Sequence, residues 1–427
     1  MTISKEQLLV AVDHSIEAYC DAHHDFSFNP NDPVVRLHEP AFSATEIQAV
    51  VRCLLGTRVT MGEQVRQFEG EFATHACTSH GVMVNSGSSA NLLAVSALAN
   101  PVTTHHLRPG DEVIVPALSW STTIWPLIQN NLVPVFVDID PVTLNMDPVE
   151  LERAISPKTR AVMIVPVYGN PCDMDAITEI CRRRDLILIE DCCEALGTVY
   201  DGKPVGTFGQ VGTFSFYYSH HITTMEGGIC VTNDFELAET MRILRAHGWV
   251  REVQNPQPYY DQYPDIDPRF LFVNVGYNLR PMELQGAMGS VQLPKLAGFV
   301  AQRQRCATAL RTGLESLELF VFQDETPKGQ HSWFGFPMTL KKNAPFSTHE
   351  LRTFLTQSRI ESRPIICGNV ALQPAMQRYP HRVAGTLEHA TRVMYHGLAI
   401  PSHHAMNAAA CDYVIKQIRA FVDKKTA

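Results

Sequence analysis

The sequence predicts an α/β fold: a mainly parallel β-sheet covered by helices, followed by a smaller α+β domain. Between about residues 40 and 240, short apolar runs alternate with amphipathic segments. The apolar runs are nearly continuous, as in strands that are buried on both faces of a sheet. The chain has 427 residues, which exceeds the usual size of a single hydrophobic core. We therefore expect one large domain and one smaller domain.

The expected strands of the large domain are short and rich in Val, Ile and Leu. They are 112–116, 133–139, 161–167, 186–189, 212–217 and 228–232. Helices are expected between most of them, for example at 88–98 and 235–247. Ahead of the sheet, apolar residues at helical spacing predict an N-terminal helix within residues 1–28, and the Pro- and Asn-rich stretch 29–33 ends it.

The pattern changes after Pro294. A long helix (296–314) is followed by a strand-like run (332–340), a helix near 349–358 and a final helix (409–423). We expect three parts: an N-terminal helical extension (1–35), a large domain (36–293) and a small C-terminal domain (294–427). Residues 250–267, rich in Tyr, Pro, Gln and Asp, are expected to form an ordered loop or interface arm.

Composition excludes several classes of protein. The net charge of −9 and the isoelectric point near 6.0 argue against a nucleic-acid-binding protein. No apolar stretch approaches the roughly 18 residues that cross a bilayer. Early charges and the lack of a signal-peptide core at the N-terminus favour a cytoplasmic location. The eleven cysteines include no C-x-x-C pair, so reduced, mostly buried thiols are expected and no metal site is predicted.

A Gly- and Ser-rich turn is the first candidate binding element. Residues 85–91 (Asn-Ser-Gly-Ser-Ser-Ala-Asn) follow the apolar run 82–84 and precede a helix. Backbone N–H groups and the helix dipole at such a turn favour a phosphate dianion. A plain serine N-cap explains the same residues about equally well.

Asp191 and Trp120 are further candidates. Asp191 ends the apolar run 186–191, and ligands of parallel sheets bind at the carboxyl ends of strands. A carboxylate there can keep a pyridine nitrogen protonated, although a cap or turn role is common for an isolated Asp. Trp120, in the string Pro-Ala-Leu-Ser-Trp-Ser-Thr-Thr, offers a flat stacking surface, and an ordinary core Trp is the alternative.

A further string is found at residues 215–228, which read Ser-Phe-Tyr-Tyr-Ser-His-His-Ile-Thr-Thr-Met-Glu-Gly-Gly. Together with the strings above, it resembles the DegT/StrS-type nucleotide-sugar aminotransferases. The resemblance implies a type I aminotransferase-like fold with a mainly parallel seven-stranded sheet. It also implies a site for pyridoxal phosphate (PLP) or pyridoxamine phosphate (PMP). The residues implied to hold the cofactor are Gly87, Ser88, Ser89 and Ser215 at the phosphate, Asp191 at the ring nitrogen, Trp120 over the ring and Glu194 near the ring hydroxyl.

The string 275–285 (Val-Gly-Tyr-Asn-Leu-Arg-Pro-Met-Glu-Leu-Gln) is close to another motif of this family. There the Asn reaches the phosphate of a neighbouring subunit, which implies a homodimer in which Asn278 binds the partner's cofactor. Arg280, Arg363 and His221 are candidate substrate-binding residues, and the two arginines suit a carboxylate or a diphosphate. As bare residues, Asn278 and Arg280 could equally be surface polar groups.

The family tethers PLP to a lysine, but here that position holds His220. No lysine occurs between Lys203 and Lys295. Histidine cannot form an imine but can transfer protons. The chain thus looks closest to the histidine-bearing branch, the nucleotide-sugar 3-dehydratases that make 3,6-dideoxy sugars, as found in lipopolysaccharide O-antigens. Met225 departs from the family, which usually has Gly there.

This branch implies non-covalent PMP, His220 as the catalytic acid–base, and removal of the C3 hydroxyl of a nucleotide-linked 4-keto-6-deoxyhexose. L-Glutamate then regenerates PMP. An iron–sulfur version with a reductase is the first alternative, but it needs four cysteines, and the loop matching 247–275 has none. A PLP-fold protein without catalytic activity is the second alternative.

Overall fold

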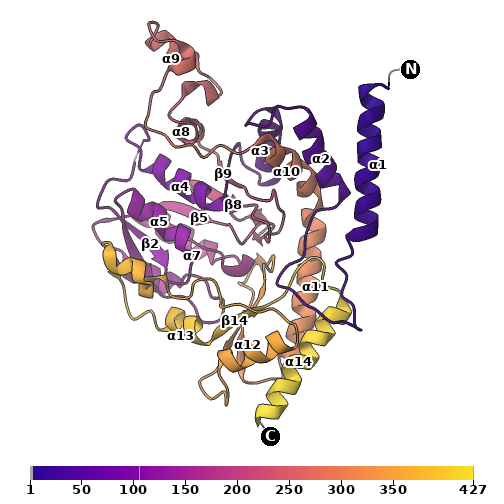
Figure 1. The fold of residues 1–427 in the computed structure, drawn as a ribbon. Helices are drawn as coiled ribbons and strands as arrows, with labels where there is room; N and C mark the ends of the chain where they lie inside the picture. The colour runs from indigo at the N-terminus through magenta and orange to yellow at the C-terminus, as the bar shows by residue number, and fades with distance from the viewer. Residues whose placement is uncertain (1–2, 105, 427) are drawn as a thin grey trace.

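The computed structural model describes residues 3–104 and 106–426, and an eight-stranded β-sheet lies at its centre (Figure 1). Its strands are β1 (His80–Val84), β2 (Glu112–Pro116), β3 (Val133–Val137), β4 (Thr159–Ile164), β5 (Ile187–Asp191), β8 (Val211–Ser215), β9 (Gly228–Thr232) and β13 (Arg382–Val383). The order is β1-β9-β8-β5-β4-β2-β3-β13. All neighbours from β8 to β13 pair in parallel, whereas β9 is antiparallel to β1 and β8.

The sheet has one strand more than the seven expected. The extra strand, β13, is only two residues long and comes from the C-terminal part of the chain. Arg382 in β13 forms an ion pair with Glu112 of β2 at 2.7 Å, across the intervening β3. A strand of two residues carries no periodic pattern, so the sequence could not have revealed it.

Helices cover both faces of this sheet, as the continuous apolar strands predicted. In β2, Val113 and Val115 pack toward one face and Ile114 toward the other. The first face is covered by α4 (Gly87–Leu98), α5 (Ser121–Gln129), α8 (Phe235–Arg245) and α13 (Glu388–His396). The second is covered by α3 (Glu63–His75), α6 (Pro148–Ala154) and α7 (Met174–Arg184).

Helix starts follow the local sequence. Ser86, Asp147, Asp173 and Asp234 precede α4, α6, α7 and α8, respectively, and each side chain accepts a hydrogen bond from a backbone N–H of the first turn. Such caps satisfy donors that the helix itself leaves free. Because α4 begins directly after β1, its N-terminus lies at the carboxyl end of that strand.

A second core lies in the C-terminal part. Its antiparallel sheet has the order β10-β12-β14 and consists of β10 (Phe320–Phe322), β12 (Phe336–Leu340) and β14 (Gly397–Ile400). Helices α11 (Leu296–Leu314), α12 (Thr348–Gln357) and α14 (Ala408–Thr426) pack around it. Val370 and Val393, however, are buried in the core of the large sheet. The division of the chain at residue 293 therefore stays a prediction.

Two expected elements differ most from their predicted bounds. The N-terminal helix α1 covers Lys5–His23, with Ser4 as its N-cap, rather than all of residues 1–28, of which residues 1 and 2 lie outside the described part of the chain. The strand expected from residue 332 begins at Phe336, because Trp333 adopts a left-handed backbone conformation with φ of 49°. That conformation interrupts an extended strand.

The remaining elements lie mostly at the periphery. They are α2 (Ala44–Leu55), α9 (Gln257–Gln262), α10 (Glu283–Gln292), a small sheet of β11 (Gly329–Gln330), β6 (Val199–Tyr200) and β7 (Lys203–Pro204), and short 3-10 turns at 167–169, 250–252, 268–270, 293–295, 370–372 and 374–378. Figure 1 shows α1 along one side of the molecule and α9 on a projecting arm. Among the described residues, no helix combines the length and apolar character that a membrane crossing requires.

Candidate active site

Eight of the twelve predicted site residues line one cavity of about 420 Å³. It lies where β5 ends and α4 begins, the edge at which parallel sheets bind ligands. The eight are Gly87, Ser88, Trp120, Asp191, Glu194, Ser215, His220 and Arg363. The other lining residues are Ser86, Asn91, Thr122, Thr123, Val165, Cys193, Tyr217, Ser219, Glu226, Phe334 and Ile366.

Asp191, the last residue of β5, is buried and rigidly oriented. Its Oδ2 accepts hydrogen bonds from Nδ2 of Asn91 at 2.8 Å and from Oγ1 of Thr123 at 2.6 Å. Its Oδ1 accepts only a long bond from the backbone N–H of Cys193, at 3.3 Å. One carboxylate oxygen is thus fixed by the protein while the other retains acceptor capacity toward a ligand.

The N-terminus of α4 forms the opposite end of the cavity. Ser86 caps the helix by accepting from the N–H of Ser89 at 3.1 Å. The N–H groups of Gly87 and Ser88 have no partner within the helix and can bind an anion. A Cβ added at Gly87 would lie 2.4 Å from Cβ of Ser215, so only glycine lets Ser215 approach this turn.

Ser89 is directed away from the cavity. Its hydroxyl donates to Oδ1 of Asn85 at 2.6 Å and its N–H is used by the cap. Ser88, one residue earlier, lines the cavity and donates its hydroxyl proton to Oγ1 of Thr122 at 2.9 Å. Of Ser88 and Ser89, Ser88 is therefore the one available to a phosphate.

His220 lines the cavity, and none of the nineteen described residues around it is a lysine. The flanking lysines of the sequence lie elsewhere: Lys203 stacks on the Phe208 ring and Lys295 pairs with Glu46. Burial, together with the positive charge of Arg363, lowers the pKa of His220 to about 3. The imidazole is consequently neutral at neutral pH and can accept a proton.

His221 does not reach the cavity. Its side chain is buried, and its Nε2 lies 3.2 Å from the backbone oxygen of Ser332. Of the two adjacent histidines, His220 alone is placed to act on a ligand.

Glu194 and Arg363 share one wall of the cavity. Burial raises the pKa of Glu194 to about 7, against the opposing effect of Arg363. Burial lowers the pKa of Arg363, but attraction to Tyr168 and Glu194 outweighs it and raises that pKa above its ordinary value. Nε of Arg363 donates to the Tyr168 hydroxyl at 3.2 Å. No carboxylate of the described residues forms a direct ion pair with Arg363. Its guanidinium therefore retains donors for an anionic ligand.

The loop after His220 has Met225 at the position where the family usually has glycine. Met225 takes a left-handed conformation, with φ of 69°, and its N–H donates to Oγ1 of Thr223 at 2.9 Å. The next residue, Glu226, is fixed through its backbone oxygen, which accepts from Thr224 at 2.7 Å and from Gln285. Met225 therefore adopts backbone geometry that glycine enters at lower cost.

Asn278 and Arg280 lie outside the cavity of this chain. Nε of Arg280 donates to Oδ1 of Asn278 at 3.0 Å, and the Arg280 guanidinium lies 5.8 Å from the Trp249 ring. Asn278 is exposed. Asn278 is thus available at the surface, whereas Arg280 is half-buried.

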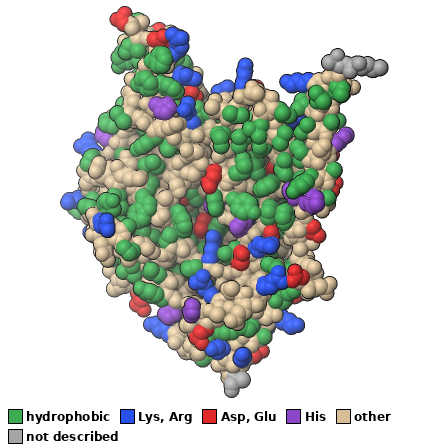
Figure 2. All heavy atoms as spheres, in the orientation of Figure 1, with side chains coloured by type: hydrophobic (Ala, Val, Ile, Leu, Met, Phe, Trp, Pro, Cys, Tyr) green, Lys and Arg blue, Asp and Glu red, His purple; other side chains and the backbone are tan. Residues whose placement is uncertain are grey.

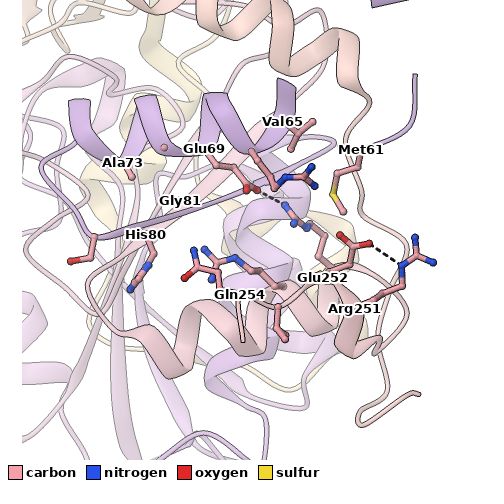
Figure 3. A pocket seen from close by; sticks show the side chains of 15 residues that line it. Met61, Val65, Glu69, Ala73, His80, Gly81, Arg251, Glu252 and Gln254 are labelled. Carbon is pink, nitrogen blue, oxygen red and sulfur yellow. Dashed lines mark hydrogen bonds and ion pairs between the residues drawn. The ribbon is translucent and has the colours of Figure 1, made fainter. Parts of the chain in front are cut away.

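A second pocket, of about 320 Å³, lies between α3, the start of β1 and the end of α8 (Figure 3). Four arginines line it, but three are paired: Arg245 with Glu69 at 2.5 Å, Arg242 with Glu239 at 2.6 Å and Arg251 with Glu252 at 3.5 Å. These pairs compensate most of its positive charge. None of the predicted site residues lies there.

Asn91, Thr123 and Phe334 line the cavity but were not predicted as site residues. Asn91 lies one helical turn after Ser88, so the 3.6-residue period of the helix would have placed it on the same face. Thr123 lies one turn after Trp120 at the start of α5. Phe334 lies in an irregular turn before β12, and no local pattern predicts that position.

These residues fit a phosphorylated pyridine cofactor. The turn at Gly87 is close-packed against Ser215 yet leaves two N–H groups for a phosphate. One oxygen of Asp191 remains available for a protonated ring nitrogen. Trp120 is 54% exposed even though it borders the cavity, as a stacking surface for a ring would be.

Comparisons with known proteins agree with this geometry. Residues 40–419 match the DegT/DnrJ/EryC1/StrS aminotransferase family. The chain is 42% identical over 377 residues to GDP-4-keto-6-deoxy-D-mannose 3-dehydratase of Yersinia pseudotuberculosis, covering 86% of this chain and 95% of the relative. It is 38% identical over 389 residues to dTDP-4-dehydro-2,6-dideoxy-D-glucose 3-dehydratase of Saccharopolyspora spinosa, covering 88% and 84%.

A solved structure of GDP-4-keto-6-deoxymannose-3-dehydratase with a trapped PLP-glutamate geminal diamine superposes with a TM-score of 0.84. It shares 37% identity, over 90% of this chain and 100% of that one. The family match includes every residue that lines the cavity, and the chain belongs to the DegT/DnrJ/EryC1/StrS aminotransferase family.

Proposed function

We propose that this protein is a PMP-dependent nucleotide-sugar 3-dehydratase, a lyase. It removes the C3 hydroxyl of a nucleotide-linked 4-keto-6-deoxyhexose, and L-glutamate regenerates PMP. The observation that carries the proposal is His220: it lies in a cavity fitted to a phosphorylated pyridine, and no lysine is among the described residues that line it. The similarity to 3-dehydratases that act on GDP- and dTDP-linked sugars supports the same conclusion.

When bound, PMP supplies an amine that condenses with the ketone and a ring that withdraws electrons from it. The protein holds that group without a covalent bond. The N-terminus of α4 and Ser215 bind the phosphate, Asp191 keeps the ring nitrogen protonated, and Trp120 covers one ring face. Glu194, whose pKa burial raises to about 7, can share a proton with the ring hydroxyl.

His220 transfers the protons. Its imidazole is neutral at rest, because burial and Arg363 lower its pKa, so it can remove a proton from the cofactor's methylene carbon. The imidazolium that forms lies near Arg363 and is therefore strongly acidic. It returns its proton readily to the C3 hydroxyl, which leaves as water. Since none of the described residues that line the cavity is a lysine that could displace the sugar first, elimination outcompetes amino transfer.

Glutamate is the proposed amino donor for the second half of the cycle. Arg363 offers a guanidinium at the cavity wall that suits a carboxylate. Over the full cycle, the sugar loses one oxygen atom and glutamate becomes 2-oxoglutarate and ammonia. The atoms and electrons balance without another reductant.

We also propose a homodimer in which Asn278 binds the cofactor phosphate of the partner. Asn278 is exposed and lies outside its own cavity. Large apolar side chains are exposed nearby on the arm and on α2, including Phe270, Phe272, Val275, Leu54 and Leu55. Figure 2 shows hydrophobic side chains gathered on this face below the arm. Burial of such a patch favours association.

The deciding experiment is product analysis by mass spectrometry. Purified protein with PLP is incubated with glutamate and, in turn, CDP-, GDP- and dTDP-linked 4-keto-6-deoxy sugars. We expect one of them to lose an oxygen atom, with release of ammonia that depends on glutamate. His220→Asn abolishes the reaction, whereas His221→Asn, the neighbour directed away from the cavity, retains it.

Two results would overturn the proposal. One is an aminosugar product, which is the outcome of transamination. The other is PLP that stays attached to the protein after borohydride reduction, since that requires a lysine tether. Iron in stoichiometric amount would instead favour the iron–sulfur version of the reaction.

A further inference from the structure

We propose that Phe334 is the residue that positions the catalytic imidazole of His220, and that Arg303 and a strained turn hold Phe334 in place. This inference rests on the proposed role of His220 as acid–base. Phe334 lies more than one hundred residues away in the chain and comes from the turn before β12. It lines the active-site cavity together with His220.

His220 lacks the hydrogen-bonded partner that usually orients a catalytic histidine. Its Nδ1 is buried, and no donor or acceptor among the described residues contacts it. A general base must nevertheless be held at a fixed angle to the proton that it removes. Two aromatic rings contact the imidazole instead. The centroid of the Phe334 ring lies 4.9 Å from that of the imidazole, with an angle of 54° between the ring planes, and the corresponding values for Tyr217 are 5.9 Å and 85°.

Of these two rings, Phe334 is the fixed one. Its side chain is 7% exposed, whereas Tyr217 is 45% exposed. The backbone N–H of Phe334 donates to the backbone oxygen of Tyr168 at 2.7 Å, and the backbone oxygen of Phe334 accepts from Nη1 of Arg303 at 2.9 Å. Both backbone polar groups of Phe334 are thus bonded to buried residues.

Arg303 comes from α11 and is 1% exposed. Its Nη1 donates to three backbone oxygens: those of Trp333 at 3.2 Å, Phe334 at 2.9 Å and Ser402 at 2.7 Å. No described carboxylate forms an ion pair with it. Burying an arginine without a counter-ion costs free energy. Because Arg303 binds three backbone oxygens nonetheless, we infer a specific role for the turn that contains Trp333 and Phe334.

The turn itself is strained. Trp333 has a left-handed backbone, with φ of 49°, which is unfavourable for a bulky residue. Ser332 fixes the turn from the other side: its N–H donates to the Gly169 oxygen at 3.0 Å, and its hydroxyl accepts from Thr198 at 2.8 Å. A Cβ at Gly169 would lie 2.2 Å from that hydroxyl oxygen. The turn is therefore bound on both sides in a conformation that it would not adopt alone.

Two cations also pack against the ring of Phe334. The guanidinium carbons of Arg363 and Arg303 lie 5.2 Å and 6.0 Å from the centre of its ring. Both arginines lower the pKa of His220, after burial itself. The ring thus contacts the imidazole and both guanidinium groups, which fixes it further in place.

The test compares Phe334→Leu with wild type, Phe334→Tyr and the control Phe336→Leu. Phe336 lies two residues further on, is equally buried and packs in the C-terminal core, away from His220. We expect Phe334→Leu to lower kcat by roughly 10- to 100-fold with KM and the dissociation constant of PMP unchanged, because misorientation affects the chemical step. Phe334→Tyr, which keeps the ring, retains most of kcat, and Phe336→Leu retains it as well.

A second readout does not depend on activity. Crystal structures of the PMP-bound wild type and Phe334→Leu should show the His220 imidazole rotated or disordered in the variant, with the backbone of 332–334 unchanged. An ordered imidazole in its original orientation would overturn the positioning role. So would equal losses of kcat in Phe334→Leu and Phe336→Leu. If wild-type protein dehydrates no sugar, the proposed function fails, and the crystal structures still decide the role of Phe334.

Discussion

Nδ2 of Asn91 donates a hydrogen bond to Oδ2 of Asp191 across 2.8 Å, joining the first helix after β1 to the end of β5. Asn91 is itself fixed, because its Oδ1 accepts from Oγ1 of Thr213 at 2.6 Å. Thr123 donates to the same oxygen of Asp191 at 2.6 Å. The carboxylate proposed to face the pyridine nitrogen is therefore oriented by three secondary-structure elements before any ligand binds.

Thr123→Val should weaken cofactor binding without unfolding the protein. The substitution removes a hydrogen bond to a charged group, which contributes about 1.5–3 kcal/mol. The dissociation constant of PMP, measured by fluorescence titration, should rise by roughly tenfold or more. Thr178→Val is the matched control, since Thr178 lies on α7 and bonds only backbone oxygens. Equal affinities for the two variants would show that Asp191 needs no such orientation.

Gly87→Ala tests the close approach of the phosphate turn to Ser215. The new methyl group would lie 2.4 Å from Cβ of Ser215. We expect a loss of about 1–3 kcal/mol in the free energy of unfolding, from overpacking, together with weaker cofactor binding. Urea denaturation and PMP titration measure the two effects separately.

The double variant Gly87→Ala/Ser215→Gly separates packing from binding. Removing the Ser215 side chain takes away the nearest atoms that the methyl group meets. Stability should return toward that of the wild type, while PMP affinity stays low because the phosphate has lost the Ser215 hydroxyl. Recovery of both properties would argue against Ser215 as a phosphate contact.

The buried imidazole of His220 should make the cofactor-free protein sensitive to acid. Its pKa is lowered to about 3 in the folded state and is about 6.5 in an unfolded chain. Between those values the unfolded state binds more protons, so stability falls as pH falls. At pH 5 this one group costs about 2 kcal/mol relative to pH 7.

His220→Asn removes that titration. Urea denaturation of the cofactor-free proteins at pH 7 and pH 5 should give a smaller acid-induced loss in His220→Asn than in wild type, by about 2 kcal/mol. Other buried histidines, such as His331 and His403, contribute to both proteins alike and cancel in the comparison. An identical pH dependence in the two proteins would mean that the imidazole is not buried in its neutral form.

Met225 provides a test of the loop after His220. With φ of 69°, this position disfavours side chains branched at Cβ. Met225→Val should lower the thermal midpoint, at a cost of about 1–2 kcal/mol, whereas Met225→Gly should not. A thermal midpoint for Met225→Val equal to that of wild type would show that the loop adopts another conformation.

The sequence was most informative where local pattern and chemistry coincide. The apolar runs predicted β2 and β9 with their observed bounds, and Asp191 was recognisable because it ends such a run. The turn at Gly87 and the histidine at 220 were likewise visible in short strings. These features depend on neighbours in the chain, which a single sequence displays directly.

The missed features depend on contacts between distant segments. Phe334 reaches His220 only because Arg303 of α11 and Gly169 constrain a turn that no residue pattern marks. The string 85–91 was predicted to lie at the start of a helix, but the direction of the Ser89 side chain depends on its hydrogen bond to Asn85 and not on its spacing. The short strand β13 pairs with β3, and its Arg382 forms an ion pair with Glu112, which is distant in the chain.

The product of the reaction decides whether His220 turns an aminotransferase-like site into a dehydratase. The mass and amino content of the sugar product are determined after incubation with PLP, glutamate and a nucleotide-linked 4-keto-6-deoxyhexose. We expect a product that is one oxygen atom lighter and whose sugar carries no amino group, with one ammonia released per sugar. A product that keeps its C3 hydroxyl and gains an amino group would contradict it.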